Sequence, residues 1–321
     1  MNFRLGLALL ALGCGTSQGP IVIAHRGASG HRPEHTLEAY ALAVHMGADF
    51  IEPDLVSTKD GVLVARHENE IGETTDAATR FADRRATKVI DGDTISGWFS
   101  EDFTLAELRT LRAKERLPIR STVYDGRFLV PTFDEVLALA DSLGRVRERD
   151  VGVYPETKHP EYFRAIGLPL EERLLEALER YDLDGRHDPV YIQSFDSASL
   201  RYLRPRTRAR LVQLVQDSSQ VTPSALKEIA RYADGIGVNT RLVVPARAGA
   251  PPTALVTDAR DAGLFVHVWT LRPEPRFLAE RYNGDPLAEV RELAALGVDG
   301  MFGDYPDQLL QGLGRLPTMK E

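Results

Sequence analysis

Short apolar runs alternate with amphipathic segments along most of this 321-residue chain. Eight of the runs are rich in β-branched residues and bounded by turn residues, which is typical of buried strands. They begin at Ile21, Phe50, Val151, Val190, Arg210, Gly235, Phe265 and Gly300. Helical spacing is found over residues 36–46, 133–143, 170–181, 197–203, 223–232, 253–262 and 287–296. Strands that alternate with helices pair in parallel, and eight of them close a TIM (β/α)8 barrel, an α/β fold.

One segment departs from this alternation. Thr58-Lys59-Asp60-Gly61 predicts a hairpin-like turn, so the run from Val62 to Arg66 is expected beside the second strand and not as a further barrel strand. Residues 69–130 do not fit a βα repeat; they hold a turn at Asp91-Gly92-Asp93 and a short helix opened by Thr104. We interpret about 69–130 as an insertion after the second strand region of one barrel domain that spans residues 21–313. It would be either a lid over a site or a stabilising cap.

The overall charge restricts the partners that this chain can have. Its net charge of −8 provides no basic face for nucleic acid or acidic lipid. The sequence contains no Walker loop, no Gly-rich dinucleotide fingerprint and no CxxC pair. We therefore expect no nucleic acid partner, and the charge does not by itself identify another one. A small-molecule substrate is implied only by the motifs described below, and the sequence leaves the oligomeric state open.

The first twenty residues predict a signal peptide followed by a short tether. Arg4 gives one positive charge, and residues 5–12 are almost wholly apolar, a stretch too short to span a bilayer. Ala11-Leu12-Gly13-Cys14 resembles a bacterial lipoprotein cleavage site, with Ala11 where the usual motif has Leu. Cys14 is the only cysteine, so no intrachain disulfide can form. We expect an exported protein, periplasmic or lipid-anchored through Cys14; simple secretion with an unused thiol is the alternative.

Two carboxylates stand at positions i and i+2 of the second run, so the side chains of Glu52 and Asp54 point to one face of that strand. Two acids at one level repel each other and are costly to bury unneutralised. A divalent cation would remove the repulsion, and hard oxygen ligands suit calcium or magnesium. Glu156, at the end of another strand, would be the third ligand. Ion pairs with Arg26 and Lys158 are the alternative, and the spacing alone does not decide between them.

Two histidines, His25 and His67, each end an apolar run. A single such histidine is usually structural, but two near a carboxylate cluster suit general acid–base chemistry, because imidazole titrates close to neutral pH. Arg26 and Lys158 are cations that can bind an anion such as a phosphate, since Arg engages two phosphate oxygens and Lys acts as a point charge. Loop or helix-surface positions are expected for His31, His45, His159 and His187, and either the core or the helix layer for His267.

An ordered set of motifs resembles the glycerophosphodiester phosphodiesterase family over nearly everything after residue 20. The motifs are His25-Arg26-Gly27, Pro33-Glu34-His35-Thr36, Glu52-Pro53-Asp54, Asp60-Gly61 followed by His67, Pro155-Glu156-Thr157-Lys158, Gln193-Ser194-Phe195, Trp269-Thr270 and Asp304-Tyr305-Pro306. The resemblance implies hydrolysis of glycerophosphodiesters, such as glycerophosphocholine and glycerophosphoethanolamine, to sn-glycerol 3-phosphate and an alcohol. Sequence does not say whether the nucleophile is water or a glycerol hydroxyl.

The resemblance also implies roles for individual residues. One divalent cation would be bound by Glu52, Asp54 and Glu156, and the proton transfers would be carried out by His25 and His67. Substrate binding would fall to Arg26, Lys158, Gln193, Phe195 and Trp269, with Phe195 and Trp269 lining the glycerol pocket. Many members have Asn where His35 stands, so His35 makes this chain more similar to the periplasmic, calcium-dependent branch. Calcium is therefore the favoured ion, with magnesium as the alternative.

Two other functions compete with this one. A phospholipase C-like or D-like barrel that acts on intact lipids also uses paired histidines, but it needs an exposed apolar rim, and the insertion has no long apolar run. A lipoprotein that binds glycerophosphodiesters without cleaving them would not need both histidines and all three acids. A turnover assay on glycerophosphocholine, with and without chelator, separates the three.

Overall fold

A parallel barrel forms the centre of the computed structural model, which describes residues 19–315. Its strands are β1 (Ile21–His25), β2 (Phe50–Glu52), β3 (Asp54–Ser57), β7 (Gly152–Val153), β8 (Glu156–Thr157), β9 (Tyr191–Ser194), β10 (Arg210–Val215), β11 (Gly235–Asn239), β12 (Phe265–Leu271) and β13 (Gly300–Gly303). Neighbouring strands pair in parallel, and β13 pairs with β1. The predicted TIM-barrel class is confirmed.

Prolines divide two of the eight barrel strands into halves. Pro53 separates β2 from β3, and Pro155 separates β7 from β8, because proline has no N–H to donate to a strand ladder. Their carbonyls still accept: the Glu156 N–H donates to Pro53 O at 2.9 Å, and the Gln193 N–H donates to Pro155 O at 2.9 Å. Because β2 pairs with β7 and β3 with β8, each pair of halves acts as one strand, and the barrel closes with eight.

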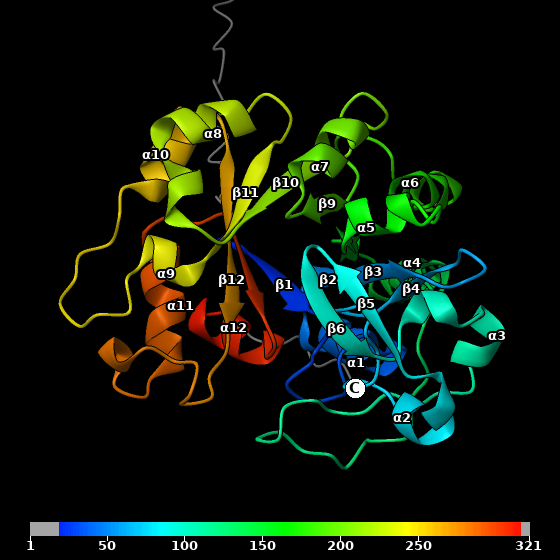
Figure 1. Cartoon of the computed structure of the whole chain (residues 1–321). Coiled ribbons are helices and arrows are strands. Elements are labelled where there is room, and N and C mark those ends of the chain that lie inside the picture. Colours follow the sequence, from blue (N-terminus) through cyan, green and yellow to red (C-terminus); the bar gives the residue numbers. More distant parts are fainter. Residues whose placement is uncertain (1–18, 316–321) are drawn as a thin grey trace, which may run out of the picture.

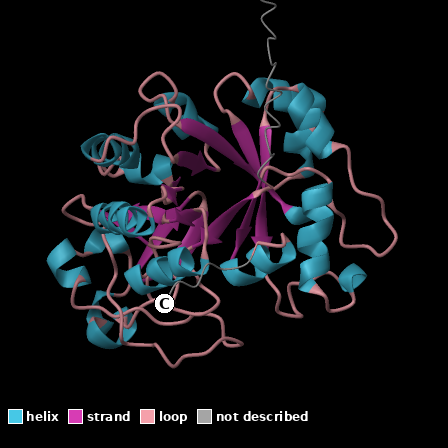
Figure 2. Cartoon of the chain, turned by 180° about the vertical axis from the view of Figure 1, so that it is seen from behind, coloured by secondary structure: helices cyan, strands magenta, loops and turns pink. Residues whose placement is uncertain are grey.

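Helices surround the strands on the outside (Figure 2). They are α1 (Leu37–Met46), α4 (Phe133–Arg147), α5 (Pro160–Ala165), α6 (Leu170–Arg180), α7 (Ser197–Leu203), α8 (Pro223–Ile229), α9 (Thr240–Val243), α10 (Leu255–Asp261), α11 (Pro286–Ala295) and α12 (Pro306–Gly312). The helix predicted at 36–46 is confirmed as α1: the Thr36 side chain accepts from the Ala39 N–H at its start, and Gly47 ends it in the left-handed region. The six other predicted helices are present within a few residues, whereas the short helices α5, α9 and α12 were not predicted.

The inserted segment joins the barrel through a hairpin. As predicted, β4 (Leu63–Ala65) pairs antiparallel with β3 and adds no barrel strand. Residues 69–130 then form α2 (Ala77–Arg80), the 3-10 turns Ala82–Arg84 and Ser100–Asp102, the hairpin β5 (Ala86–Ile90) and β6 (Asp93–Gly97), and α3 (Leu105–Leu108). The turn at Asp91-Gly92 was predicted, with φ positive at both residues, but its flanking strands were not. Figure 1 draws this hairpin in cyan beside the barrel strands.

The N-terminal predictions concern residues that the structure does not describe. The signal peptide and Cys14 lie outside residues 19–315. Within that range, no helix is both long and apolar enough to cross a membrane.

An aromatic cluster fills the interior of the barrel. Its buried members are Ile23, Phe50, Tyr154, Tyr191, Val212 and Phe302. His267, which was expected in either the core or the helix layer, lies in this interior, with 1% of its surface exposed and its Nδ1 2.8 Å from the Tyr154 hydroxyl. A histidine in such a place is neutral in the folded protein, because burial disfavours the imidazolium.

We expect His267 to weaken the protein in mildly acidic solution. Burial, aided by the charge of Arg210, lowers its pKa to about 3. The unfolded chain, with a histidine pKa of about 6.5, takes up the proton first, so this stabilisation is complete above that pKa and is lost as pH falls towards 3. Between about pH 7.5 and pH 5 the loss should be about 2 kcal/mol. Urea unfolding of the wild type and His267→Gln at both pH values measures it; equal pH dependence in the two proteins would contradict the expectation.

Candidate active site

Three buried carboxylates meet at one edge of the barrel. Glu52 ends β2, Asp54 begins β3, and Glu156 begins β8, where it lies beside Asp54 in the strand register. Each offers one oxygen, and these oxygens all lie within 4.8 Å of one another. The exposed fractions of the three residues are 1%, 1% and 7%. The predicted convergence of Glu52 and Asp54 on one face, with Glu156 as the third group, is therefore present.

The three acids cannot all be ionised without a compensating charge. Burial and the neighbouring Asp54 raise the pKa of Glu52 well above its usual value, and burial raises the pKa of Glu156 to about 8. Burial also opposes ionisation of Asp54, but the hydrogen bond from His35 and the charge of Arg26 hold its pKa well below the usual range. A divalent cation would replace the two bound protons, and an all-oxygen donor set fits calcium or magnesium. These residues therefore fit a metal site.

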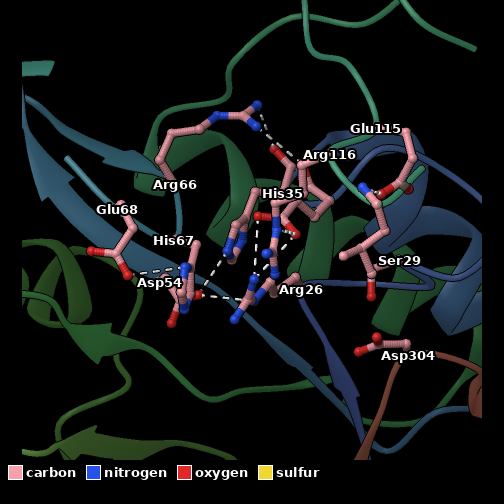
Figure 3. A network of polar contacts seen from close by, with 12 residues as sticks. Arg26, Ser29, His35, Asp54, Arg66, His67, Glu68, Glu115, Arg116 and Asp304 are labelled. Carbon is pink, nitrogen blue, oxygen red and sulfur yellow. Dashed lines mark hydrogen bonds and ion pairs between the residues drawn. The ribbon is translucent and has the colours of Figure 1, made fainter. Parts of the chain in front are cut away.

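Two buried cations flank the acids. Arg26 follows β1 with a positive φ of 60°; its Nε lies 3.3 Å from an Asp54 oxygen, and its backbone N–H donates to Glu52 at 2.8 Å. The Nζ atom of Lys158 lies 3.1 Å from a Glu156 oxygen. The ion pairs that were considered as an alternative to a metal are thus present. They do not neutralise the cluster fully, because the pKa values of Glu52 and Glu156 remain raised. Figure 3 shows Arg26, His35 and Asp54 converging.

Both predicted histidines line one cavity of about 1040 Å³ beside these acids. His25 ends β1, and its Nδ1 lies 2.6 Å from Asp304 Oδ1. His67 follows β4, and its Nδ1 lies 3.0 Å from a Glu68 oxygen. Burial and the charge of Arg26 lower the pKa of His25 to about 4, and the same causes hold the pKa of His67 well below its usual value. With each Nδ1 occupied, Nε2 is the nitrogen that each ring has left for other partners.

Part of the cavity wall is aromatic, and two of its residues carry unpaired polar atoms. Trp269 and Phe195 meet edge to face with ring centroids 5.8 Å apart, and Phe302 lies beside them along the wall. Gln193 donates from Nε2 to Glu52 at 3.1 Å, whereas its buried Oε1 has no hydrogen-bond partner within residues 19–315. The buried Trp269 Nε1–H likewise lacks one among the described residues. Both residues line the cavity, and each has one buried polar atom without a hydrogen-bond partner in the described residues.

A sequence model of the glycerophosphoryl diester phosphodiesterase family matches residues 25–308. The chain belongs to this family. A glycerophosphodiester phosphodiesterase of Arabidopsis thaliana is 38% identical over 319 residues, which cover 90% of this chain and 85% of that protein. One from Haemophilus influenzae is 30% identical over 340 residues, with 91% and 90% covered. An Oleispira antarctica phosphodiesterase, solved in complex with the product sn-glycerol-3-phosphate, has the same fold, with a TM-score of 0.62 at 21% identity over 92% of this chain and 97% of that one.

The cavity and its surroundings include residues that sequence reasoning did not assign. His35 was noted only for its similarity to the periplasmic branch and was given no role; it is fully buried, and its Nε2 lies 2.9 Å from Asp54 while its Nδ1 lies 2.7 Å from the Tyr40 hydroxyl. His159 lies on a loop, as expected, and it also lines the cavity between Glu68 and Asp91, each 2.6 Å away. Its position directly after Lys158 was the only available signal.

Further unassigned residues carry charge around the cavity. They are Glu34, Glu68, Arg116, Arg120, Arg272 and Asp304. Glu34 and Asp304 stand inside motifs that carried the family resemblance, so their motifs were visible in the sequence although their contacts were not. The three arginines and Glu68 have no such signal, because nothing local distinguishes them from surface residues.

We expect calcium to stabilise the folded protein through the three acids. Because the folded state alone assembles the oxygens, an ion at about 100 times its dissociation constant adds about 2.7 kcal/mol, which is on the order of 5 °C in the midpoint for a chain of this size. Thermal unfolding of chelator-treated protein, with and without added calcium, measures the shift. Asp54→Asn should abolish it, while Asp93→Asn, an exposed control on β6, should retain it. A wild-type midpoint that calcium does not change would rule out calcium, and one that neither calcium nor magnesium changes would rule out the site.

Proposed function

We propose that this chain hydrolyses glycerophosphodiesters to sn-glycerol 3-phosphate and an alcohol. The observation that carries the proposal is one cavity lined by two histidines, two cations and two carboxylates that belong to a buried cluster of three mutually close acids. The two relatives compared above are glycerophosphodiester phosphodiesterases, and the Oleispira antarctica enzyme was solved with this product. The assay is release of sn-glycerol 3-phosphate from glycerophosphocholine. Intact phosphatidylcholine tests the lipase alternative, and binding without release tests the non-catalytic one.

The phosphate would lie over the acids, held by Arg26 and Lys158. Glu52, Asp54 and Glu156 would hold one divalent cation, for which we propose calcium because His35 matches the periplasmic branch. The ion, when bound, supplies positive charge that stabilises the charge developing on the phosphate oxygens. With the ion bound, the acids would no longer need Arg26 and Lys158 to neutralise them. The two side chains would then be available to bind the substrate.

The glycerol half would lie against the aromatic wall. After a side-chain rotation that exposes these buried atoms, Gln193 Oε1 would accept a hydrogen bond from a glycerol hydroxyl, and the Trp269 Nε1–H would donate one. Phe195 and Trp269 would cover the carbon atoms of the glycerol. These two buried, unpaired atoms would then both be satisfied by substrate, which fits the cost of leaving buried polar atoms unpaired.

The two histidines would move the protons of the reaction. As the nucleophilic oxygen bonds to phosphorus, its proton passes to one imidazole, and as the bond from phosphorus to the alcohol oxygen breaks, that oxygen takes a proton from the other. Both transfers would use Nε2, since each Nδ1 already contacts a carboxylate. Hydrolysis then leaves the pair with the same number of protons as before.

Replacing either histidine should lower turnover with little loss of fold. We expect His25→Ala and His67→Ala to lower kcat on the order of 10²–10⁴-fold, the usual worth of a positioned acid or base. His187→Ala, an exposed histidine outside the cavity lining, is the matched control and should keep wild-type kcat. Steady-state kinetics on glycerophosphocholine, with circular dichroism to check folding, make the comparison. A near-normal rate in either variant would remove that histidine from the mechanism.

The alcohol half would lie on the side formed by the hairpin β5–β6. Asp91 and Gly92, at its tip, line the cavity, and Asp91 contacts His159, which in turn contacts Glu68 beside His67. The aromatic wall, in contrast, comes from the loop after β9 and from β12 and β13. A diester with its glycerol against that wall would direct its alcohol towards the hairpin tip.

Shortening the hairpin should therefore change which alcohols are accepted. Replacing residues 87–96 by a tight turn removes the tip, so relative kcat/KM should change among choline, ethanolamine and bulkier diesters, whereas inhibition by sn-glycerol 3-phosphate should stay nearly unchanged. Asp91→Asn is a milder companion that keeps the backbone. Equal losses for every diester would mean that the insertion is only a stabilising cap.

We also propose that the chain is exported and anchored by a lipid on Cys14. The support is the apolar stretch before Ala11-Leu12-Gly13-Cys14 in the sequence. Globomycin, which blocks lipoprotein signal cleavage, should cause precursor to accumulate, and Cys14→Ser should release the protein from the membrane fraction. A Cys14→Ser protein that is processed normally and stays in the membrane would refute the anchor.

A further inference from the structure

Asp304, which follows β13, contacts His25 through one of its oxygens and two arginines through the other. Its Oδ1 lies 2.6 Å from His25 Nδ1, while its Oδ2 accepts from Arg272 Nε and Arg120 Nη2, each at 2.6 Å. Only 1% of its surface is exposed. Because the arginines occupy Oδ2, the remaining oxygen is left to His25 alone.

Arg120 reaches this carboxylate from the insertion, 184 residues away in sequence. Its side chain is 5% exposed and has two further acceptors: Glu274 Oε1, 2.7 Å from its Nε, and the Ser29 carbonyl, 3.2 Å from its Nη1. The Ser29 hydroxyl donates to the carbonyl of His25 at 2.8 Å, so Arg120 also braces the loop that carries this histidine. Figure 3 shows Ser29 and Asp304 on the same side of Arg26.

A guanidinium with this many partners differs from an ordinary surface ion pair. Burying a charge is costly unless its hydrogen-bonding groups are satisfied, and a lone exposed pair contributes little. Arg120 uses its planar, forked donors on three acceptors that come from three separate loops. The contact is therefore geometrically specific, and it links the insertion to the histidine that ends the first barrel strand.

We propose that Arg120 is a positioning residue for His25 and acts through Asp304. An ionised Asp304 only accepts, so His25 must carry its proton on Nδ1, and Nε2 keeps its lone pair on the cavity side. By occupying Oδ2, Arg120 and Arg272 fix the rotation of the carboxyl and hence the orientation of the imidazole. The inference rests on the proposed function and assigns to the insertion a part in catalysis besides any choice of alcohol.

The other histidine lacks such a brace. Glu68, its carboxylate partner, has a side chain 39% exposed and also contacts Lys158 and His159. No arginine within the described range is paired with Glu68, whereas two are paired with Asp304. The two histidines therefore differ in how firmly they are held, and the difference comes from Arg120 and Arg272.

The test uses the full calcium-loaded protein and three arginine variants. Arg120→Met removes the charge and the donors at similar length, Arg120→Lys keeps the charge, and Arg127→Met makes the same change at an exposed arginine of the same insertion. We expect Arg120→Met to lower kcat on glycerophosphocholine about 10- to 100-fold with KM nearly unchanged, the range found when a supporting contact is removed. Arg120→Lys should lie between it and the wild type, and Arg127→Met should match the wild type.

Side-chain nitrogen NMR provides a readout that a merely structural role would not change. The imidazole signals of His25, assigned by their loss in His25→Gln, should show the proton on Nδ1 in the wild type. Arg120→Met should shift them towards a mixture of tautomers, and Asp304→Asn, which can donate to Nδ1, should favour the proton on Nε2. In a His25→Gln background, Arg120→Met should cause no further loss of kcat.

Three outcomes would overturn the proposal. One is an unchanged tautomer in Arg120→Met together with lower stability, which would make Arg120 a structural brace only. Another is a further loss of kcat in the His25→Gln background, which would place its effect elsewhere. The third applies if Arg120→Met does not fold: Arg120→Lys with wild-type kcat would then show that charge alone suffices. If no diester is hydrolysed, the proposed function fails, and the NMR comparison still tests the contact by itself.

Discussion

Mutual repulsion among Glu52, Asp54 and Glu156 is the constraint on which the rest of this site depends. Three buried carboxylates with oxygens within 4.8 Å of one another cannot all be ionised unless neighbouring groups supply positive charge. Arg26 and Lys158 offset part of the repulsion, and His35 binds Asp54 from behind. The same cations are the groups that a phosphate needs. The acids therefore suit a bound metal cation, and the two basic side chains suit a phosphate anion at the same place.

The barrel holds these acids at the two places where its ladder is interrupted. Pro53 lies between Glu52 and Asp54, and Pro155 directly precedes Glu156. Each proline contributes a carbonyl and no N–H, so the strands stay in register while the backbone divides into short halves. The first interruption thus has an acid on either side of its proline and the second has one acid after it, and the parallel register brings Glu156 next to Asp54. The positions of the three acids, and hence their repulsion, are thus set by the backbone of the strands and not by loops.

The sequence was sufficient to predict elements and side-chain directions wherever these depend on a local period or spacing. Spacing of i and i+2 placed Glu52 and Asp54 on one face, and turn residues 58–61 correctly excluded β4 from the barrel. It was insufficient for β5 and β6, whose residues are mostly exposed or half-buried and so lack a clear apolar alternation. It also could not pair Arg120 with Asp304, because an ion pair between distant loops depends on how the insertion folds back, which no local pattern encodes.

The insertion contacts the site in two places, so its length does not leave it detached from the barrel. One of its loops sends Arg116 to Glu34, the acid that also holds Arg26, and Arg120 to Asp304, the acid that holds His25. Its hairpin tip reaches His159 and, through Glu68, the side of the cavity where His67 lies. The first contact is buried and has several partners, whereas the second is partly exposed. A segment anchored firmly at one histidine and loosely at the other can keep the phosphate side fixed while its tip varies with the alcohol.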